Sequence, residues 1–98
     1  MLVHTVFFWL PSDLDETQRA AFQAGVDSLA TISCAEAVYI GTPAATDRPV
    51  IDKSYDISLT VLLKDMDAHD AYQVDPIHLA FLEGFRSVWE RVLIYDAD

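Results

Sequence analysis

Tyr72 and His78 are the two side chains of this sequence whose types and spacing suit proton-transfer chemistry. They stand on either side of Asp75-Pro76, in the stretch Tyr-Gln-Val-Asp-Pro-Ile-His. An unperturbed imidazole titrates near pH ~6.5, so it can both take and give a proton at neutral pH. A tyrosine hydroxyl can donate a hydrogen bond to an oxygen on which negative charge develops. The pair would therefore suit the removal of a proton next to a carbonyl group, with His78 as base and Tyr72 as donor.

Each of these residues also has a purely structural interpretation. His78 can be a residue at the edge of an amphipathic helix that hydrogen-bonds Tyr72, and Tyr72 can be a core aromatic whose hydroxyl reaches a partner. We expect His4, on the inward face of a strand, to be a satisfied core histidine and His69, on a polar helix face, to be solvated. A metal site could draw on His4, His78 and Asp75, but these residues have no tight ligand spacing, and no metal is expected.

Asp75 and Pro76 form a helix start signal. An Asp side chain at the N-cap accepts bonds from free backbone N–H groups, and Pro at the first helical position gives up no hydrogen bond. Apolar residues then recur at three- and four-residue spacing and predict a helix that ends near Trp89, with His78 at the margin of its apolar stripe: Ile77, Phe81, Gly84, Phe85, Val88 and Trp89. If the Asp75 carboxylate points at His78, it favours the imidazolium and weakens the base. If it caps the helix, His78 keeps a pKa near its ordinary value.

The rest of the chain is expected to alternate between strands and helices. Hydrophobic periodicity, capping signals and turn residues predict strands at Leu2–Leu10, Cys34–Gly41, Ser54–Lys64 and Arg91–Tyr95, a helix from a capping-box-like Asp13 and Glu16 to about Ile32, and a short helix at Asp65–Val74. The order is β-α-β-β-α-β with the second helix broken in two. It predicts an α+β, ferredoxin-like domain over residues 1–98, with an antiparallel sheet and helices on one face.

One face of this sheet is expected to bind a second copy of the chain. The first strand is apolar on both sides, and helices can cover only one of them. The outer face would carry aromatic residues that a soluble monomer does not normally expose together. We therefore predict a homodimer joined mainly through this face: Thr5, Phe7, Trp9, Ser58, Thr60 and Leu62.

Composition excludes several classes of partner. Sixteen acidic against six basic residues give a net charge of −10, which disfavours nucleic acid and anionic lipid surfaces. No apolar run approaches the roughly 18 residues of a membrane span, and the N-terminus lacks the basic flank of a signal peptide. The lone Cys34 suits a reducing compartment, so a cytoplasmic protein is expected. No Gly-rich phosphate loop is present, and no cofactor is expected.

The sequence resembles the stress-responsive dimeric α/β-barrel family almost from end to end. The residues that carry the resemblance are Met-Leu-Val-His-Thr-Val-Phe-Phe-Trp at the start, Ser54-Tyr55-Asp56, the stretch from Tyr72 to His78, Phe81, and Phe85 to Arg91. The most specific motif is a Tyr, two spacers and then His-Pro-X-His; this chain has Asp75 in place of the first histidine. The resemblance implies a ferredoxin-like fold and a homodimer whose two sheets close into a barrel. Most members have no assigned activity.

Within that family the chain is similar to olivetolic acid cyclase-type polyketide cyclases, whose functional Tyr and His fall on Tyr72 and His78. The similarity implies that His78 removes a proton between two carbonyls of a polyketide thioester while Tyr72 holds the substrate oxygen. It also implies an apolar ligand pocket lined by His4, Val6, Phe8, Phe22, Val26, Ile57, Leu59, Val61, Phe81 and Trp89. A further pocket histidine of those enzymes falls on Ile57.

Two hypotheses follow from the residues and the resemblance together. The first is a homodimeric binding module with a small apolar pocket for an unknown ligand. The second is a cofactor-independent enzyme, a polyketide cyclase-like lyase or an oxygenase, that acts on an enolisable carbonyl compound through His78 and Tyr72. An open pocket of a few hundred Å³ favours the enzyme, and a closed or filled space favours the module.

Overall fold

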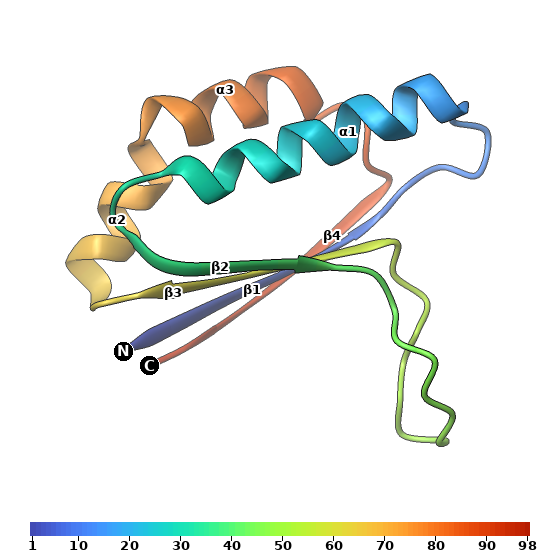
Figure 1. The fold of residues 1–98 in the computed structure, drawn as a ribbon, viewed down its shortest axis with the longest axis horizontal. Coiled ribbons are helices and arrows are strands. Elements are labelled where there is room, and N and C mark those ends of the chain that lie inside the picture. Colours follow the sequence, from blue (N-terminus) through green and yellow to red (C-terminus); the bar gives the residue numbers. More distant parts are fainter.

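Four antiparallel strands form one sheet, and the helices cover one of its faces (Figure 1). The computed structural model describes residues 1–98, with the elements β1 (Leu2–Trp9), α1 (Glu16–Ser28), a 3-10 turn η1 (Leu29–Thr31), β2 (Ala35–Gly41), β3 (Ile57–Leu63), α2 (Met66–Val74), α3 (Pro76–Phe85) and β4 (Arg91–Ala97). The sheet order is β2-β3-β1-β4, and every neighbouring pair is antiparallel. The predicted ferredoxin-like fold is confirmed, and the second helix is divided into α2 and α3. No helix of the chain is both long enough and apolar enough to cross a membrane.

The core lies between the sheet and the helices because the two central strands alternate strictly. Along β1 and β3, every second side chain is buried, and the inward residues of the two strands pair in register, as in Val6 opposite Leu59. Successive side chains of a strand point to opposite faces, so this pattern buries one face completely. Phe22 and Val26 of α1 complete the core with no exposed surface.

Helices α1 and α3 pack closely because Gly25 leaves room for an aromatic ring. A Cβ atom at position 25 would overlap the ring of Phe85, which lies edge-on to Phe22 at 5.6 Å between ring centroids. Phe81 packs on the same cluster, 6.0 Å from Phe22. This aromatic packing fixes α3 over the sheet and thereby fixes the position of its first turn.

Helix α1 begins two residues later than its predicted capping box. Asp15 is the N-cap: its carboxylate accepts a bond from the Gln18 backbone at 2.7 Å, and the Asp15 backbone donates to the Gln18 side chain at 2.9 Å. The predicted pair Asp13 and Glu16 was wrong because a glutamine at the third helical position completes a capping box as well as a glutamate does.

Helix α3 ends at Phe85, although its apolar spacing continues to Trp89. The Val88 N–H donates to the Phe85 carbonyl, which closes a turn, and the Glu90 N–H donates to Trp9 of β1 at 2.9 Å. The prediction of a helix to Trp89 was therefore wrong, because the chain leaves the helix to join the sheet. Trp89 still packs on the core, stacked on Phe81 at 6.0 Å.

Candidate functional site

The break between α2 and α3 brings Tyr72 and His78 together. Asp75 caps α3, with its Oδ1 atom accepting a bond from the Ile77 N–H at 2.9 Å, and Pro76 occupies the first turn. Tyr72 lies in the last turn of α2 and His78 in the first turn of α3, with ring centroids 5.0 Å apart. Of the two alternatives for Asp75, the structure shows the capping one.

Both side chains are buried, and each has a polar atom without a hydrogen-bond partner within the protein. Tyr72 has no exposed surface and His78 is 8% exposed. The unpartnered atoms are the Tyr72 hydroxyl and Nδ1 of His78, so the two rings do not bond each other through these atoms. Leaving a buried polar group unpaired costs on the order of 1–3 kcal/mol. Because His78 faces the core, its expected position at the margin of the apolar stripe of the helix was wrong.

Burial determines the protonation states of this pair. Loss of solvent lowers the pKa of His78 below its usual value, and the backbone of Gln73 offsets part of that effect. Loss of solvent also raises the pKa of Tyr72 well above its usual value. At neutral pH the imidazole is consequently neutral and the phenol keeps its proton. Capping by Asp75 does not leave His78 with an ordinary pKa, because burial outweighs it.

A cavity of about 130 Å³ lies between α3 and the inner face of β1 and β4. Tyr72 and His78 line it, together with six of the ten residues expected in a ligand pocket: His4, Val6, Phe8, Leu59, Phe81 and Trp89. The other four lie in the packed core and do not line the cavity: Phe22, Val26, Ile57 and Val61.

Five further residues line the cavity and were not expected from the sequence: Leu29, Gln73, Leu82, Val92 and Ile94. Val92 and Ile94 are on β4, the edge strand, where they pair with Phe8 and Val6 of β1 and so share their face. Their spacing of two residues is the signal that could have found them. Ile94 is 49% exposed, so the cavity lies under the less covered edge of the sheet.

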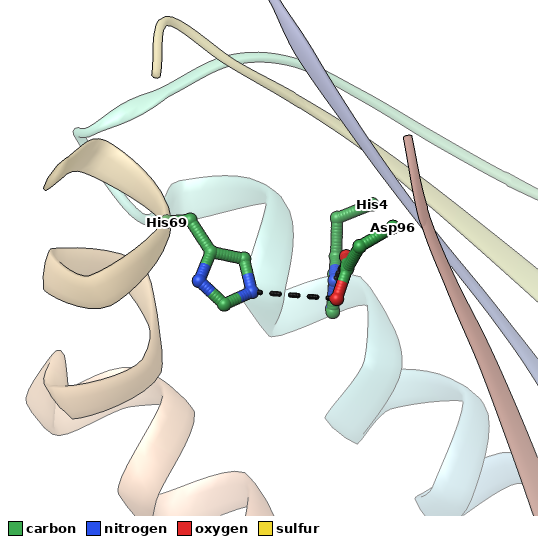
Figure 2. Close-up of side chains that lie close together, drawn as sticks. All are labelled: His4, His69 and Asp96. Carbon is green, nitrogen blue, oxygen red and sulfur yellow. Dashed lines mark hydrogen bonds and ion pairs between the residues drawn. The ribbon is translucent and has the colours of Figure 1, made fainter. Parts of the chain in front are cut away.

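His4, which lines the cavity, meets His69 where β1 and β4 run beside α2 (Figure 2). His4 is 3% exposed, lies edge-on to Tyr72 at 5.7 Å, and has Nδ1 2.5 Å from Oδ1 of Asp96. His69 lies edge-on to His4 at 5.5 Å, and its side chain is only 15% exposed. The prediction of a solvated His69 was wrong, because α2 turns this residue toward the end of the sheet.

Comparison with known proteins agrees with the fold. The family model described as "Stress responsive A/B Barrel Domain" matches residues 2–98. A dabb family protein from Mesorhizobium loti with a ferredoxin-like fold is similar, with 22% identity, a TM-score of 0.79 and coverage of 99% of this chain and 94% of that one. No curated protein matches the sequence.

Two other solved structures are similar over nearly their whole lengths. One is a dimeric ferredoxin-like protein of unknown function from Thermobifida fusca, with 20% identity, a TM-score of 0.77 and coverage of 98% of this chain and 88% of that one. The other is the hydroxynitrile lyase from Passiflora edulis, with 19% identity, a TM-score of 0.78 and coverage of 98% and 90%. At these identities, the similarity establishes the fold.

Proposed function

Because the chain belongs to the stress-responsive A/B barrel domain family, we propose that it forms a homodimer and binds a small, largely apolar molecule in the cavity beneath α3. The observation that carries the ligand proposal is the pair of unpartnered polar atoms, the Tyr72 hydroxyl and His78 Nδ1, in a cavity whose other walls are mostly apolar. The net charge of −10 and the lone Cys34 suit a cytoplasmic protein without a nucleic-acid partner.

The uncovered face of the sheet supports the homodimer. All helices lie on the other face, and the segment 42–56 between β2 and β3 extends away from them (Figure 1). The face carries a hollow of about 220 Å³ lined by Phe7, Trp9, Asp52, Tyr55, Leu93 and Tyr95. Arg91 lies over the Trp9 ring at 4.2 Å from its centroid. A second copy would bury these aromatic side chains. The similar protein from Thermobifida fusca is described as dimeric.

The size and polarity of the cavity define the class of ligand. At about 130 Å³ it is smaller than the ~300–1,000 Å³ of a drug-sized site, so the ligand is compact. An acceptor oxygen on the ligand would bond the Tyr72 hydroxyl, and the remainder would contact side chains such as Phe8, Phe81 and Trp89. Binding would give the tyrosine a partner that the protein does not supply.

The protonation states of the pair favour a second candidate function, a cofactor-independent enzyme. A neutral His78 can accept an α-proton from an enolisable carbonyl compound at Nδ1, while the protonated Tyr72 donates a hydrogen bond to the enolate oxygen. Both effects are stronger once the bound ligand has displaced water from the cavity. The reaction would be that of a polyketide cyclase-like lyase or an oxygenase. The similar protein from Passiflora edulis is itself named a lyase.

An NMR screen of small ketones, aldehydes and thioesters tests the ligand proposal. The screen uses wild type, Tyr72→Phe, His78→Ala and, as matched control, Thr17→Val, which removes an exposed hydroxyl from α1. We expect a hit to bind wild type and the control and to lose affinity in Tyr72→Phe. Equal binding by all four proteins would contradict a site at this pair. Turnover of a hit by wild type but not by His78→Ala would establish the enzyme, and binding without turnover would leave the binding module.

Light scattering of the wild-type chain tests the homodimer. We expect a particle of twice the chain mass of 11.0 kDa at micromolar concentration. A stable monomer that does not change with concentration would contradict it.

A further inference from the structure

His4, His69 and Asp96 form a cluster of possible metal ligands where β1, α2 and β4 meet (Figure 2). One ligand atom from each residue lies within 4.8 Å of the other two. Asp96 stands opposite His4 in the β1–β4 register and bridges the two rings, with Oδ1 2.5 Å from His4 Nδ1 and Oδ2 3.6 Å from His69 Nε2. Three groups that are far apart in the sequence thus converge on one point.

A fourth residue supports His69 as a ligand. Oδ1 of Asp70 lies 3.2 Å from His69 Nδ1, on the side of the ring away from the cluster. A metal-binding histidine normally donates its other ring N–H to a carboxylate or carbonyl, which fixes the tautomer and orients the ring. With its Nδ1 proton directed to Asp70, His69 presents the lone pair of Nε2 to Asp96 and His4.

We propose that His4, His69 and Asp96 bind a divalent transition-metal ion of the Zn²⁺ class. Two imidazoles and a carboxylate are the donor set of open zinc and non-haem iron sites, in which the remaining positions take water or a ligand. Zn–N and Zn–O distances of about 2.0–2.2 Å place ligand atoms roughly 3.3 Å apart, so side-chain movements of about 1–2 Å bring the three groups onto an ion. The chain's net charge of −10 attracts cations toward the site.

The metal-ligand cluster and the cavity share one residue, His4, but neither site requires the other. His4 lines the cavity and lies edge-on to Tyr72, whereas His69 and Asp96 lie outside the cavity wall. The Asp96 side chain is 41% exposed, so an ion can reach the cluster from solvent. An ion here would lie beside His4, the one residue that the cluster and the cavity share.

Calorimetric titration of the tag-free, chelator-treated chain with Zn²⁺ tests the proposal. We expect saturable binding of one ion per chain in wild type. Loss of a supporting partner alone typically costs 10–100-fold in metal affinity, so Asp96→Asn and His69→Ala, which remove ligands, should weaken binding by about 100-fold or more. Replacement of Zn²⁺ by Co²⁺ gives a second readout, because its visible absorption changes when imidazole and carboxylate ligands replace water.

The matched control is Asp67→Asn, which removes the same charge from an exposed position of α2 two residues from His69. This variant should bind Zn²⁺ as wild type does. Equal affinity in Asp67→Asn and Asp96→Asn would overturn the site, as would wild type without saturable binding, which would leave the cluster as an ion pair only. Circular dichroism of each variant confirms that a loss of binding is not a loss of fold.

Discussion

Replacing Tyr72 by Phe should stabilise the free protein while removing its capacity to hold a ligand. The substitution keeps the buried aromatic ring and its edge contacts with His4 and His78, at 5.7 and 5.0 Å, and removes only a hydroxyl without a protein partner. A natural site that keeps such a group at a cost to stability is typical of function, because selection for stability alone would favour phenylalanine.

The expected gain follows from the burial of the hydroxyl. An unpaired buried hydroxyl costs about 1–3 kcal/mol, and a water molecule that enters a cavity of about 130 Å³ recovers part of it. We therefore expect Tyr72→Phe to raise the free energy of unfolding by about 1 kcal/mol. For a domain of 98 residues this corresponds to a rise in Tm of roughly 4–8 °C.

Urea denaturation at one fixed protein concentration measures this effect, because the stability of an oligomer depends on concentration. The control is Thr17→Val, which removes an exposed hydroxyl from α1 on the helical side of the sheet and should change stability by less than about 0.5 kcal/mol. A loss of about 1 kcal/mol or more in Tyr72→Phe would refute the reasoning, because it would mean that the hydroxyl has a partner in the free protein.

Three further predictions address the faces, the helix packing and the buried imidazole. Trp9→Glu should convert the homodimer to a monomer in light scattering. Phe22→Ala, in the core, should leave the homodimer intact and lower the free energy of unfolding by about 3–5 kcal/mol. Equal dissociation of the two variants would contradict the assignment of Trp9 and Phe22 to opposite faces. Gly25→Ala should lower the free energy of unfolding by about 1–3 kcal/mol in urea denaturation, because its Cβ atom would meet an aromatic ring. Gly84→Ala, whose Cβ atom would meet open space, should leave the free energy of unfolding unchanged or raise it by up to ~1 kcal/mol. The same change in both variants would contradict the packing of α1 against α3. Burial lowers the pKa of His78, so as pH falls the unfolded chain protonates this imidazole before the folded chain does. The contribution of His78 to stability is therefore complete above pH ~6.5 and is lost as pH falls from there through the lowered pKa. Denaturation of wild type and His78→Gln across this range should give different pH slopes, and identical slopes would contradict the shift.

The sequence by itself determined the features that depend on local signals. Strict alternation in β1 and β3 specifies which side chains face the core, because the two faces of a strand repeat every second residue. The Asp75-Pro76 pair specifies where α2 gives way to α3, because an N-cap and a following proline act within one helical turn. Tyr72 and His78 lie on either side of that break, but whether both rings turn into the same space depends on how α2 and α3 pack, which only the structure shows.

Other features depend on how distant segments pack, and only the tertiary structure decided them. His4 and Asp96 are separated by 92 positions and meet through the β1–β4 register, which extends past the predicted end of the last strand at Tyr95. His69 was expected in solvent because the periodicity of a short helix does not tell which neighbour its polar face meets. The burial of His78 has the same origin, and so has the direction of its pKa shift, since desolvation depends on every element packed around the ring. Whether a core residue lines the cavity or lies beside it depends on gaps of a few ångströms between α3, β1 and β4. Side-chain packing between these elements sets the gaps, and the hydrophobic periodicity of a single segment does not predict that packing.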